Sequence, residues 1–175
     1  ILLLIYLIFL FINFDFVFYL IHIIYFLVFL EILFYFKKYR ILPMIYLLIS
    51  FIFFEMIEFN KDILYSFNLF VFTIISFDIA SYVFGSFFGK NKLFKISPNK
   101  TIEGLFGGIV FSLLIGLITS YYLDLPINIK LIIFIFIIIL SSFTGDLIES
   151  YFKRRSSLNN SSEFIPGHGG VFDRF

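Results

Sequence analysis

The sequence predicts an all-α integral membrane protein, a polytopic bundle of helices. Hydrophobic residues make up 61% of its 175 residues and charged residues only 14%, which is a larger apolar share than soluble globular domains carry. Several apolar runs approach or exceed the roughly 20 residues that a helix needs to cross a bilayer. The loops between these runs alternate between basic and neutral, as the loops of polytopic membrane proteins do.

Five apolar runs are predicted to cross the membrane completely, and one crosses it in part. Residues 1–12 form the partial span, because so short a helix cannot cross the hydrocarbon layer. The complete spans are expected at residues 16–36, 41–57, 63–84, 101–123 and 129–150. We treat residues 1–175 as a single membrane domain. We also expect it to be a fragment of a longer protein that has more spans before residue 1 and another after residue 175.

The placement of positive charge predicts the orientation of the helices. Segments 37–40, 90–100 and 153–155 are basic, whereas the loops around residues 61–62 and 124–130 carry no net charge. Loops rich in Lys and Arg remain in the cytoplasm. The second and third basic segments, which also carry most of the polar motifs, are therefore predicted to share the cytoplasmic face.

Asp78 lies inside one of the predicted spans. An ionised carboxylate that faces lipid costs about 3 kcal/mol or more, so we expect Asp78 to face the interior of the bundle. Helical spacing places Tyr82, Gly85 and Gly89 on the same stripe. Two interpretations remain open: an aspartate bonded to a hydroxyl of a neighbouring helix, and a ligand in a polar cavity, which the glycines favour.

The sequence SPNKTIEG predicts the beginning of a helix. Ser97 can cap the helix and Pro98 suits its first turn. Lys100 and Thr101 would then lie near a helix N-terminus, where anions bind, and Glu103 would suit the helix dipole. A capped helix with a solvated lysine is the alternative, because the spacing of a P-loop is absent.

The last predicted span ends in a polar face. Asp146, Glu149, Ser150 and Lys153 recur at helical spacing. Mg²⁺ usually binds one or two carboxylates together with phosphate oxygens, so this face suits a metal-bound phosphate. The alternative is that both carboxylates only pair with Lys153 and Arg154.

A zinc site is less favoured by the composition. The chain has no cysteine and only two histidines, and Zn²⁺ sites in proteins use mainly Cys and His ligands. The absence of cysteine also excludes disulfides. One of the two histidines, His22, stands alone in an apolar run and is interpreted as a hydrogen-bonded interior residue.

The sequence PGHGGVFDR near the end of the chain is the most specific polar motif. Three glycines surround His168, which gives a backbone able to adopt positive φ and to expose its amides to an anion. Asp173 adds a carboxylate, and Arg174 adds a bidentate donor for phosphate. A turn needs fewer glycines, so the motif favours a binding site.

In their order and spacing these motifs resemble the phosphatidate cytidylyltransferase family, also called CDP-diacylglycerol synthase. The family pattern Ser-x-x-Lys-Arg, a short spacer and Pro-Gly-His-Gly-Gly-x-x-Asp-Arg is matched from Ser150 to Arg174. Related elements occur at residues 78–90, 97–104 and 145–150, so the resemblance identifies residues 78–175 as the catalytic region. Where the family has Lys-Asp, this chain has Asn159 and Asn160.

The resemblance implies a nucleotidyltransferase that joins CTP and phosphatidate into CDP-diacylglycerol and pyrophosphate with Mg²⁺, a second cation being left open. We assign catalytic roles to Asp146, Lys153, His168, Asp173 and Arg174. The expected metal ligands are Asp146, Asp173 and Glu149. The residues expected to bind nucleotide and phosphate are Ser97, Lys100, Thr101, Ser150, Arg154, Gly167, Gly169 and Gly170.

The expected partners are phosphatidate, CTP and the bilayer, with no nucleic acid; a homodimer is left open. The expected location is the bacterial cytoplasmic (inner) membrane, as a multi-pass protein whose active site faces the cytoplasm. Three alternatives remain: a CTP-dependent cytidylyltransferase or kinase acting on an isoprenoid lipid, a catalytically impaired family member, and a non-catalytic transporter that uses Asp78 and Asp146 as an ion path.

Overall fold

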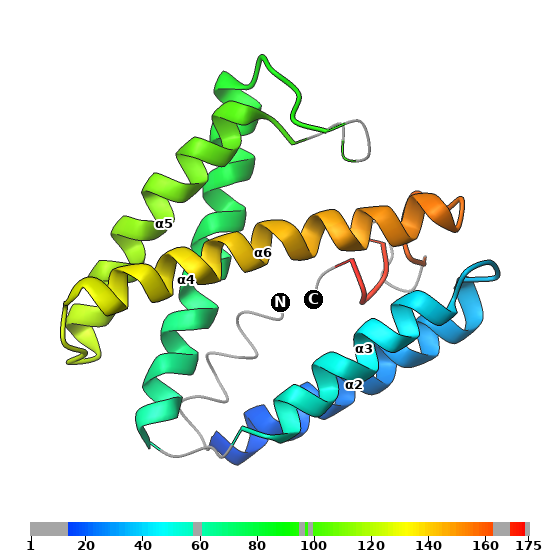
Figure 1. Ribbon diagram of the computed structural model, residues 1–175, viewed down its shortest axis with the longest axis horizontal. Coiled ribbons are helices and arrows are strands. Elements are labelled where there is room, and N and C mark those ends of the chain that lie inside the picture. Colours follow the sequence, from blue (N-terminus) through cyan, green and yellow to red (C-terminus); the bar gives the residue numbers. More distant parts are fainter. Residues whose placement is uncertain (1–13, 58–60, 95–96, 98–99, 163–168, 174–175) are drawn as a thin grey trace. The chain divides into compact units, whose positions relative to one another are not determined.

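The structure, a computed structural model, describes residues 14–57, 61–94, 97, 100–162 and 169–173. Every regular element within these ranges is an α-helix, which confirms the predicted fold class (Figure 1). The helices are α2 (Phe14–Tyr35), α3 (Ile41–Glu55), α4 (Lys61–Phe88), α5 (Ile102–Tyr122) and α6 (Ile129–Arg155). An isolated antiparallel bridge joins Lys92 to Thr101 in the loop before α5.

Within the described part of the chain, four helices are long and apolar enough to cross a membrane: α2, α4, α5 and α6. Helix α3 has 15 residues and is about 22 Å long at 1.5 Å per residue, which is less than the hydrocarbon thickness of about 30 Å. The predicted class of membrane protein is therefore confirmed, but the number of five complete spans is not. The predicted partial span at residues 1–12 lies outside the described residues.

The chain divides into two compact units, residues 1–57 with 152–175 and residues 58–151. Helix α6 belongs mainly to the second unit, and its last turn belongs to the first. That the whole chain forms a single membrane domain stays a prediction.

Within the second unit, α4 and α5 run antiparallel and pack along their length (Figure 1). The buried positions of α5 recur every four residues and all hold small residues, and a Cβ atom added at Gly104 would lie 2.6 Å from the carbonyl oxygen of Ser81. Small residues at such spacing let membrane helices approach closely, where apolar side chains alone give little preference for protein over lipid. The stripe consists of Gly104, Gly108, Ser112, Gly116 and Ser120.

Helix α5 begins at Ile102, and Thr101 is its N-cap. Thr101 has an extended backbone, and its Oγ1 accepts a hydrogen bond from the amide of Gly104 at 3.1 Å. The prediction that Ser97 and Pro98 begin this helix is wrong. The amide of Leu93 donates to the carbonyl of Lys100 at 2.9 Å and the amide of Ile102 donates to the carbonyl of Asn91 at 3.0 Å, so Lys100 and Thr101 pair with residues 91–93 instead of forming a helical turn.

The first unit contains α2, α3, the end of α6 and the C-terminal segment, of which the structure describes residues 156–162 and 169–173. Val28 and Ile32 of α2 and Phe36 just after it form the buried core of this unit with Phe152, Val171 and Phe172. The rings of Phe36 and Phe172 meet edge to face with their centroids 5.8 Å apart. Residues far apart in the sequence are thereby joined to the end of α6.

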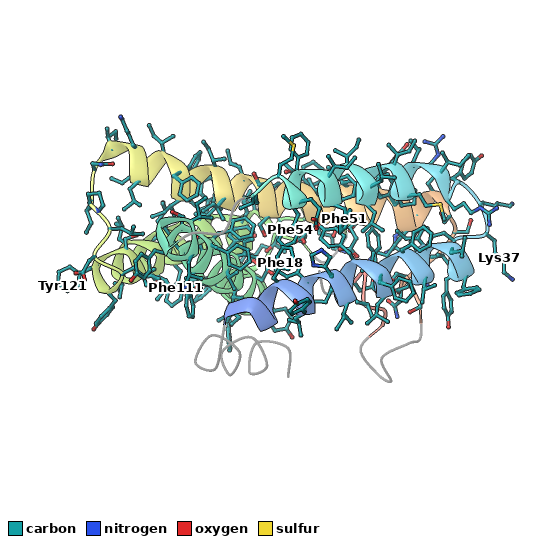
Figure 2. The ribbon with its side chains drawn as sticks, turned by 90° about the horizontal axis from the view of Figure 1, so that it is seen from below. Phe18, Lys37, Phe51, Phe54, Phe111 and Tyr121 are labelled. Atoms are coloured by element: carbon teal, nitrogen blue, oxygen red, sulfur yellow. The ribbon has the colours of Figure 1, made fainter. Side chains whose placement is uncertain are left out.

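Aromatic side chains and one polar pair join α2 to α3. Figure 2 shows Phe18, Phe51 and Phe54 between the two helices, around His22. His22 lies 2.8 Å (Nδ1) from the carbonyl oxygen of Phe18 and 2.6 Å (Nε2) from Oε1 of Glu55. His22 is hydrogen-bonded, as interpreted from the sequence, but its side chain is 33% exposed, so the expected interior position is not confirmed.

The close approach of α4 and α5 generates a stability prediction. A Cβ atom at Gly108 would lie 2.9 Å from the ring of Phe77, which is fully buried. We expect Gly108→Val to lower the free energy of unfolding by about 1–3 kcal/mol, because an overpacked helix contact must separate. Thermal unfolding of the detergent-solubilised protein measures the change.

Gly145→Ala is the matched control. No atom lies within 4 Å of a Cβ placed at Gly145 in α6. Alanine in a helix is about 0.5–1 kcal/mol more favourable than glycine, so this variant should be at least as stable as the parent protein. Equal melting temperatures for both variants would show that the glycine stripe does not set the spacing of α4 and α5.

Candidate functional site

Within the second unit, the loop before α5 places Lys100 beside α6. The Lys100 ammonium forms an ion pair with Asp146 of α6, and it lies 5.1 Å from the centroid of the Phe143 ring. The two charged side chains are 24% and 42% exposed. The lysine is therefore not simply solvated: α6 supplies both a carboxylate and an aromatic face for its charge.

Asp78 of α4 joins the same cluster. Its carboxylate accepts a hydrogen bond from the hydroxyl of Ser142, and it interacts electrostatically with both Asp146 and Lys100. Each interpretation of Asp78 thus receives support, because Asp78 is bonded to a hydroxyl of another helix and also lies beside charged groups. We name Asp78, Lys100 and Asp146 the Asp146 cluster. Two carboxylates share one ammonium there, so the cluster can accept a further cation.

A cavity of about 220 Å³ opens beside Lys100. One part of its lining is polar and the other is apolar, so it suits a ligand that is itself part charged and part apolar. Its lining residues are Phe77, Ser81, Tyr82, Leu93, Ser97, Lys100, Thr101, Gly104, Leu105 and Phe143. Three of the predicted binding residues, Ser97, Lys100 and Thr101, are among them.

Gly85 of α4 and Gly89 just after it let Thr101, which lines the cavity, pack closely against them. A Cβ atom added at Gly85 would lie 3.2 Å from Oγ1 of Thr101, and one at Gly89 would lie 2.7 Å from Cγ2 of Thr101. The loop therefore packs against α4 at the stripe that also carries Asp78 and Tyr82. The sequence predicted that something approaches these glycines closely, and within this chain Thr101 does so.

A second cluster lies in the first unit. Lys153 donates from Nζ to Oδ1 of Asp173 at 2.7 Å, and the two side chains are only 15% and 9% exposed. The second oxygen of Asp173 accepts from the amides of Gly170 at 2.9 Å and Ser161 at 3.0 Å. We name Lys153, Ser161, Gly170 and Asp173 the Asp173 cluster.

The protonation of Asp173 follows from these bonds. Burial raises the pKa of the Asp173 carboxyl, but the hydrogen bonds from Lys153, Gly170 and Ser161 outweigh burial and hold its pKa below the ordinary value. Asp173 is therefore an anion at neutral pH. Its charge is available to Lys153 or to a bound cation.

The glycines of the PGHGG sequence have specific contacts. Gly169 has a φ of 83°, which side chains rarely tolerate, and a Cβ there would lie 2.6 Å from Oδ2 of Asp173. A Cβ at Gly170 would lie 1.6 Å from Oε1 of Glu31. Within this segment the Gly170 amide is directed to Asp173, an anion supplied by the protein itself.

Arg154 is bound close to its own position in the chain. Its Nη1 donates to Oδ1 of Asn159 at 2.5 Å and to the carbonyl of Leu158 at 3.2 Å. Asn159 is one of the two positions at which the family pattern has a charged residue. A lysine there would place a second positive charge beside Arg154, whereas asparagine gives it an acceptor.

The sequence predicted that Asp146, Glu149, Ser150 and Lys153 share a helical face, and α6 is continuous through all four. The alternative was that Asp146 pairs with Lys153 or Arg154. In the structure Asp146 pairs with Lys100, and Lys153 pairs with Asp173. Glu149 and Ser150 are half-buried. The remaining predicted residues, Gly167, His168 and Arg174, lie outside the described residues.

No group of three or more Asp, Glu or His side chains gathers among the residues that the structure describes. Mg²⁺ needs only one or two protein carboxylates when substrate phosphates complete its shell. Asp146 and Asp173 each suit that requirement, the first beside Asp78 and the second as an anion at neutral pH.

Sequence reasoning assigned no role to Glu31. This carboxylate of α2 is 3% exposed and accepts hydrogen bonds from the hydroxyl of Ser161 and the amide of Phe172. An ionisable residue inside an apolar span is itself a signal, because such a residue requires a partner within the protein. Which residues bind it could not be read from the sequence.

The sequence profile of the Cytidylyltransferase family matches residues 1–175, the whole chain. Among curated relatives, the phosphatidate cytidylyltransferase of Staphylococcus epidermidis is 49% identical over 111 residues, which cover 61% of this chain and 42% of the relative. Those of Staphylococcus haemolyticus and Staphylococcus aureus are each 46% identical over 101 residues, which cover 56% of this chain and 38% of the relative.

The aligned part of this chain thus spans about two fifths of the length of these relatives. The family profile, by contrast, extends over all of the helices described above and both polar clusters. On this match the chain belongs to the Cytidylyltransferase family.

Proposed function

We propose that the protein transfers the cytidylyl group of CTP to phosphatidate, giving CDP-diacylglycerol and pyrophosphate. The observation that carries the proposal is the family match over the whole chain, together with relatives that are named phosphatidate cytidylyltransferase. A helical membrane protein with polar clusters at the ends of its helices suits a reaction between a lipid and a water-soluble nucleotide.

The reaction requires alignment and charge neutralisation more than proton transfer. A phosphate oxygen of the lipid attacks the α-phosphorus of CTP, the new P–O bond forms, and pyrophosphate leaves as the P–O bond to the β-phosphate breaks. Holding the two reactants in line lowers the barrier because less entropy is lost in the transition state. Fixed positive groups stabilise the negative charge that moves from attacking to leaving oxygen.

In the Asp146 cluster, Lys100 is proposed to bind a substrate phosphate. Asp146 and the Phe143 ring hold its ammonium at the edge of the cavity. The hydroxyls of Ser97 and Thr101, which line the same cavity, would add hydrogen bonds to that phosphate. The apolar wall formed by Phe77, Leu105 and neighbouring residues would receive the less polar part of the lipid head.

At the Asp173 cluster, Lys153 and the adjacent Arg154 are proposed to bind phosphate, with Ser150 beside them on α6. Lys153 is kept in position by Asp173, and Arg154 by Asn159 and Leu158. Gly167, His168 and Arg174 keep their proposed roles in shaping the pocket and binding phosphate. Gly169 and Gly170 are proposed to allow the tight backbone path that this pocket needs.

The carboxylates suit a divalent cation. Asp146, Asp173 and Glu149 would hold Mg²⁺, and Asp78 lies close enough to Asp146 to contribute to the charge there. When bound, Mg²⁺ would neutralise the charge of the phosphate oxygens. The fit rests on the chemistry of these oxygen donors, since hard cations prefer carboxylate and phosphate oxygens. A second cation stays a prediction.

The protein is proposed to lie in the bacterial cytoplasmic membrane with both clusters facing the cytoplasm. The support is the alternation of basic and neutral loops, the four helices of spanning length and the bacterial relatives. CTP is a cytoplasmic nucleotide, so this orientation would give it access to the lipid phosphate. A homodimer stays a prediction.

The reaction is tested with labelled CTP in membranes that contain the protein expressed from its whole reading frame. Label on the α-phosphate should appear in a lipid product when phosphatidate is supplied, and label on the γ-phosphate should not. Transfer of the γ label would instead identify a lipid kinase. Asp146→Asn and Asp173→Asn should each lower the rate about 100-fold or more, because each removes charge stabilisation at the reacting phosphates. Full activity of both variants would refute their roles.

Lys100→Met is expected to lower kcat/KM for phosphatidate or CTP about 10- to 100-fold, because a charge-assisted hydrogen bond contributes about 1.5–3 kcal/mol. Lys92→Met is the matched control, since Lys92 is an exposed lysine of the same loop whose backbone pairs with Thr101. Steady-state kinetics of both variants separate a local loss from a general effect of loop charge. An equal effect of both substitutions would contradict a specific role for Lys100.

The depressed pKa of Asp173 predicts how stability depends on pH. An aspartate whose pKa is lower in the folded protein stabilises it fully above the unfolded pKa of about 4, and this contribution is lost as pH falls through the folded pKa. We expect Asp173→Asn to be about 1–3 kcal/mol less stable than the parent at pH 7. The two proteins should become more alike as pH falls below about 4.

Chemical denaturation in detergent between pH 7 and pH 3 gives this comparison. Asp124→Asn removes an exposed carboxylate just after α5 and should differ little from the parent protein across the range. A stability difference between Asp173→Asn and the parent that is the same at pH 7 and pH 3 would show that the Asp173 charge is not involved.

A further inference from the structure

Glu31 is the most deeply buried charged side chain that the structure describes, with 3% of its surface exposed. It lies in α2 within an apolar span. Its Oε1 accepts a hydrogen bond from the hydroxyl of Ser161, and its Oε2 accepts one from the amide of Phe172 at 2.9 Å. Both donors belong to the C-terminal segment, 130 or more residues further along the chain.

Such burial is costly unless hydrogen bonds compensate for the lost water. The two bonds to the C-terminal segment supply that compensation, so the carboxylate and the segment stabilise each other. Apolar packing strengthens the same attachment, because Phe172 also lies in one core cluster with Val28 and Ile32 of α2 and with Phe36 just after it. The segment is therefore attached to α2 by a polar and an apolar contact at once.

Two residues that contact Glu31, Ser161 and Gly170, also bind Asp173. Ser161 gives its hydroxyl to Glu31 and its amide to Asp173. Gly170 gives its amide to Asp173, while its α-carbon lies so close to Glu31 that a Cβ would be 1.6 Å from Oε1. Asp173 in turn accepts from Lys153. Any shift of the Glu31 carboxylate must therefore move the groups that orient Asp173 and Lys153.

We propose that Glu31 is a positioning residue for the reaction: it fixes the C-terminal segment so that Asp173 and Lys153 keep their orientation. The inference rests on the proposed function, because it assigns Glu31 an effect on cytidylyl transfer. Glu31 itself touches neither substrate nor metal in this role. It acts through Ser161, Gly170 and Phe172, which it contacts from the side of α2.

Two substitutions separate hydrogen bonding from charge. Glutamine keeps the shape of glutamate; its carbonyl oxygen can accept from the Phe172 amide, and its amide group can donate to Ser161, whose hydroxyl also accepts. Glu31→Gln should therefore retain the attachment. Glu31→Ala leaves the Phe172 amide and the Ser161 hydroxyl without their acceptor, so the segment should detach.

Attachment can be measured without an activity assay. Residues 1–175 contain no cysteine, so once any cysteine outside them is replaced by serine, a single engineered thiol is the only one to react. Val171→Cys places this thiol in the segment at a position that is 8% exposed. In the protein expressed from its whole reading frame, maleimide should label it slowly, about tenfold or more faster with Glu31→Ala, and at nearly the original rate with Glu31→Gln.

Two controls distinguish local detachment from unfolding. Ala80→Cys reports on a buried position of α4 in the other unit, 3% exposed, and should stay unreactive in the Glu31→Ala background. Glu55→Ala removes a carboxylate of α3 whose partner is His22, and should leave labelling at position 171 unchanged. Unchanged labelling at position 171 with Glu31→Ala, or faster labelling at both thiols, would overturn the proposal.

Cytidylyl transfer is then measured on the same variants without the engineered thiols. Glu31→Ala should lower the rate about 10- to 100-fold, the usual effect of removing a group that orients a reacting residue, and Glu31→Gln should restore most of it. Detachment of the segment with full activity would refute the positioning role. If the parent protein transferred no cytidylyl group while the labelling results held, the proposed function would fail and the attachment would stand.

Discussion

The need of each charged group for a partner within an apolar protein is the constraint on which the rest of this structure depends. Lipid offers no hydrogen bonds, so a charge near the membrane interior must be satisfied by the protein itself. Lys100 is paired with Asp146, Lys153 with Asp173, and His22 with Glu55. Glu31 is bound by a hydroxyl and an amide. These contacts join segments that are distant in the sequence, and apolar surfaces alone would not select them.

In the second unit this constraint combines with close backbone packing. The stripe from Gly104 to Ser120 brings α5 against α4, and the cap at Thr101 begins α5 beside Gly85 and Gly89. Lys100, which directly precedes the cap, is thereby directed to Asp146 and the cavity. The small residues that let two membrane helices approach also set the position of a charged loop. Structural packing and the proposed phosphate site are therefore parts of one arrangement.

In the first unit the C-terminal segment takes its shape from α2. Glu31 and the apolar residues Val28, Ile32 and Phe36 hold it from one side, and Asp173 gathers its own amides and Lys153 from the other. The glycines of this segment are explained by contact as much as by conformation. Gly169 takes a positive φ, whereas Gly170 is required because a carboxylate occupies the space of its side chain. A motif read as an anion-binding turn thus contains anions of the protein itself.

The sequence by itself determined the all-helical membrane class, the ends of α5 to within one residue and the segments that carry the polar motifs, because these follow from local patterns of apolar residues, caps and charge. It placed Lys100, Asp146, Lys153 and Asp173 among the important residues. It could not decide their partners, nor that Thr101 is the residue that caps α5. Only the tertiary structure decided that Asp78 meets Ser142 and that Glu31 binds Ser161 and Phe172. The reason is physical: helical periodicity fixes neighbours three or four residues apart, whereas these pairs lie 64 to 141 residues apart and depend on which helix faces pack together.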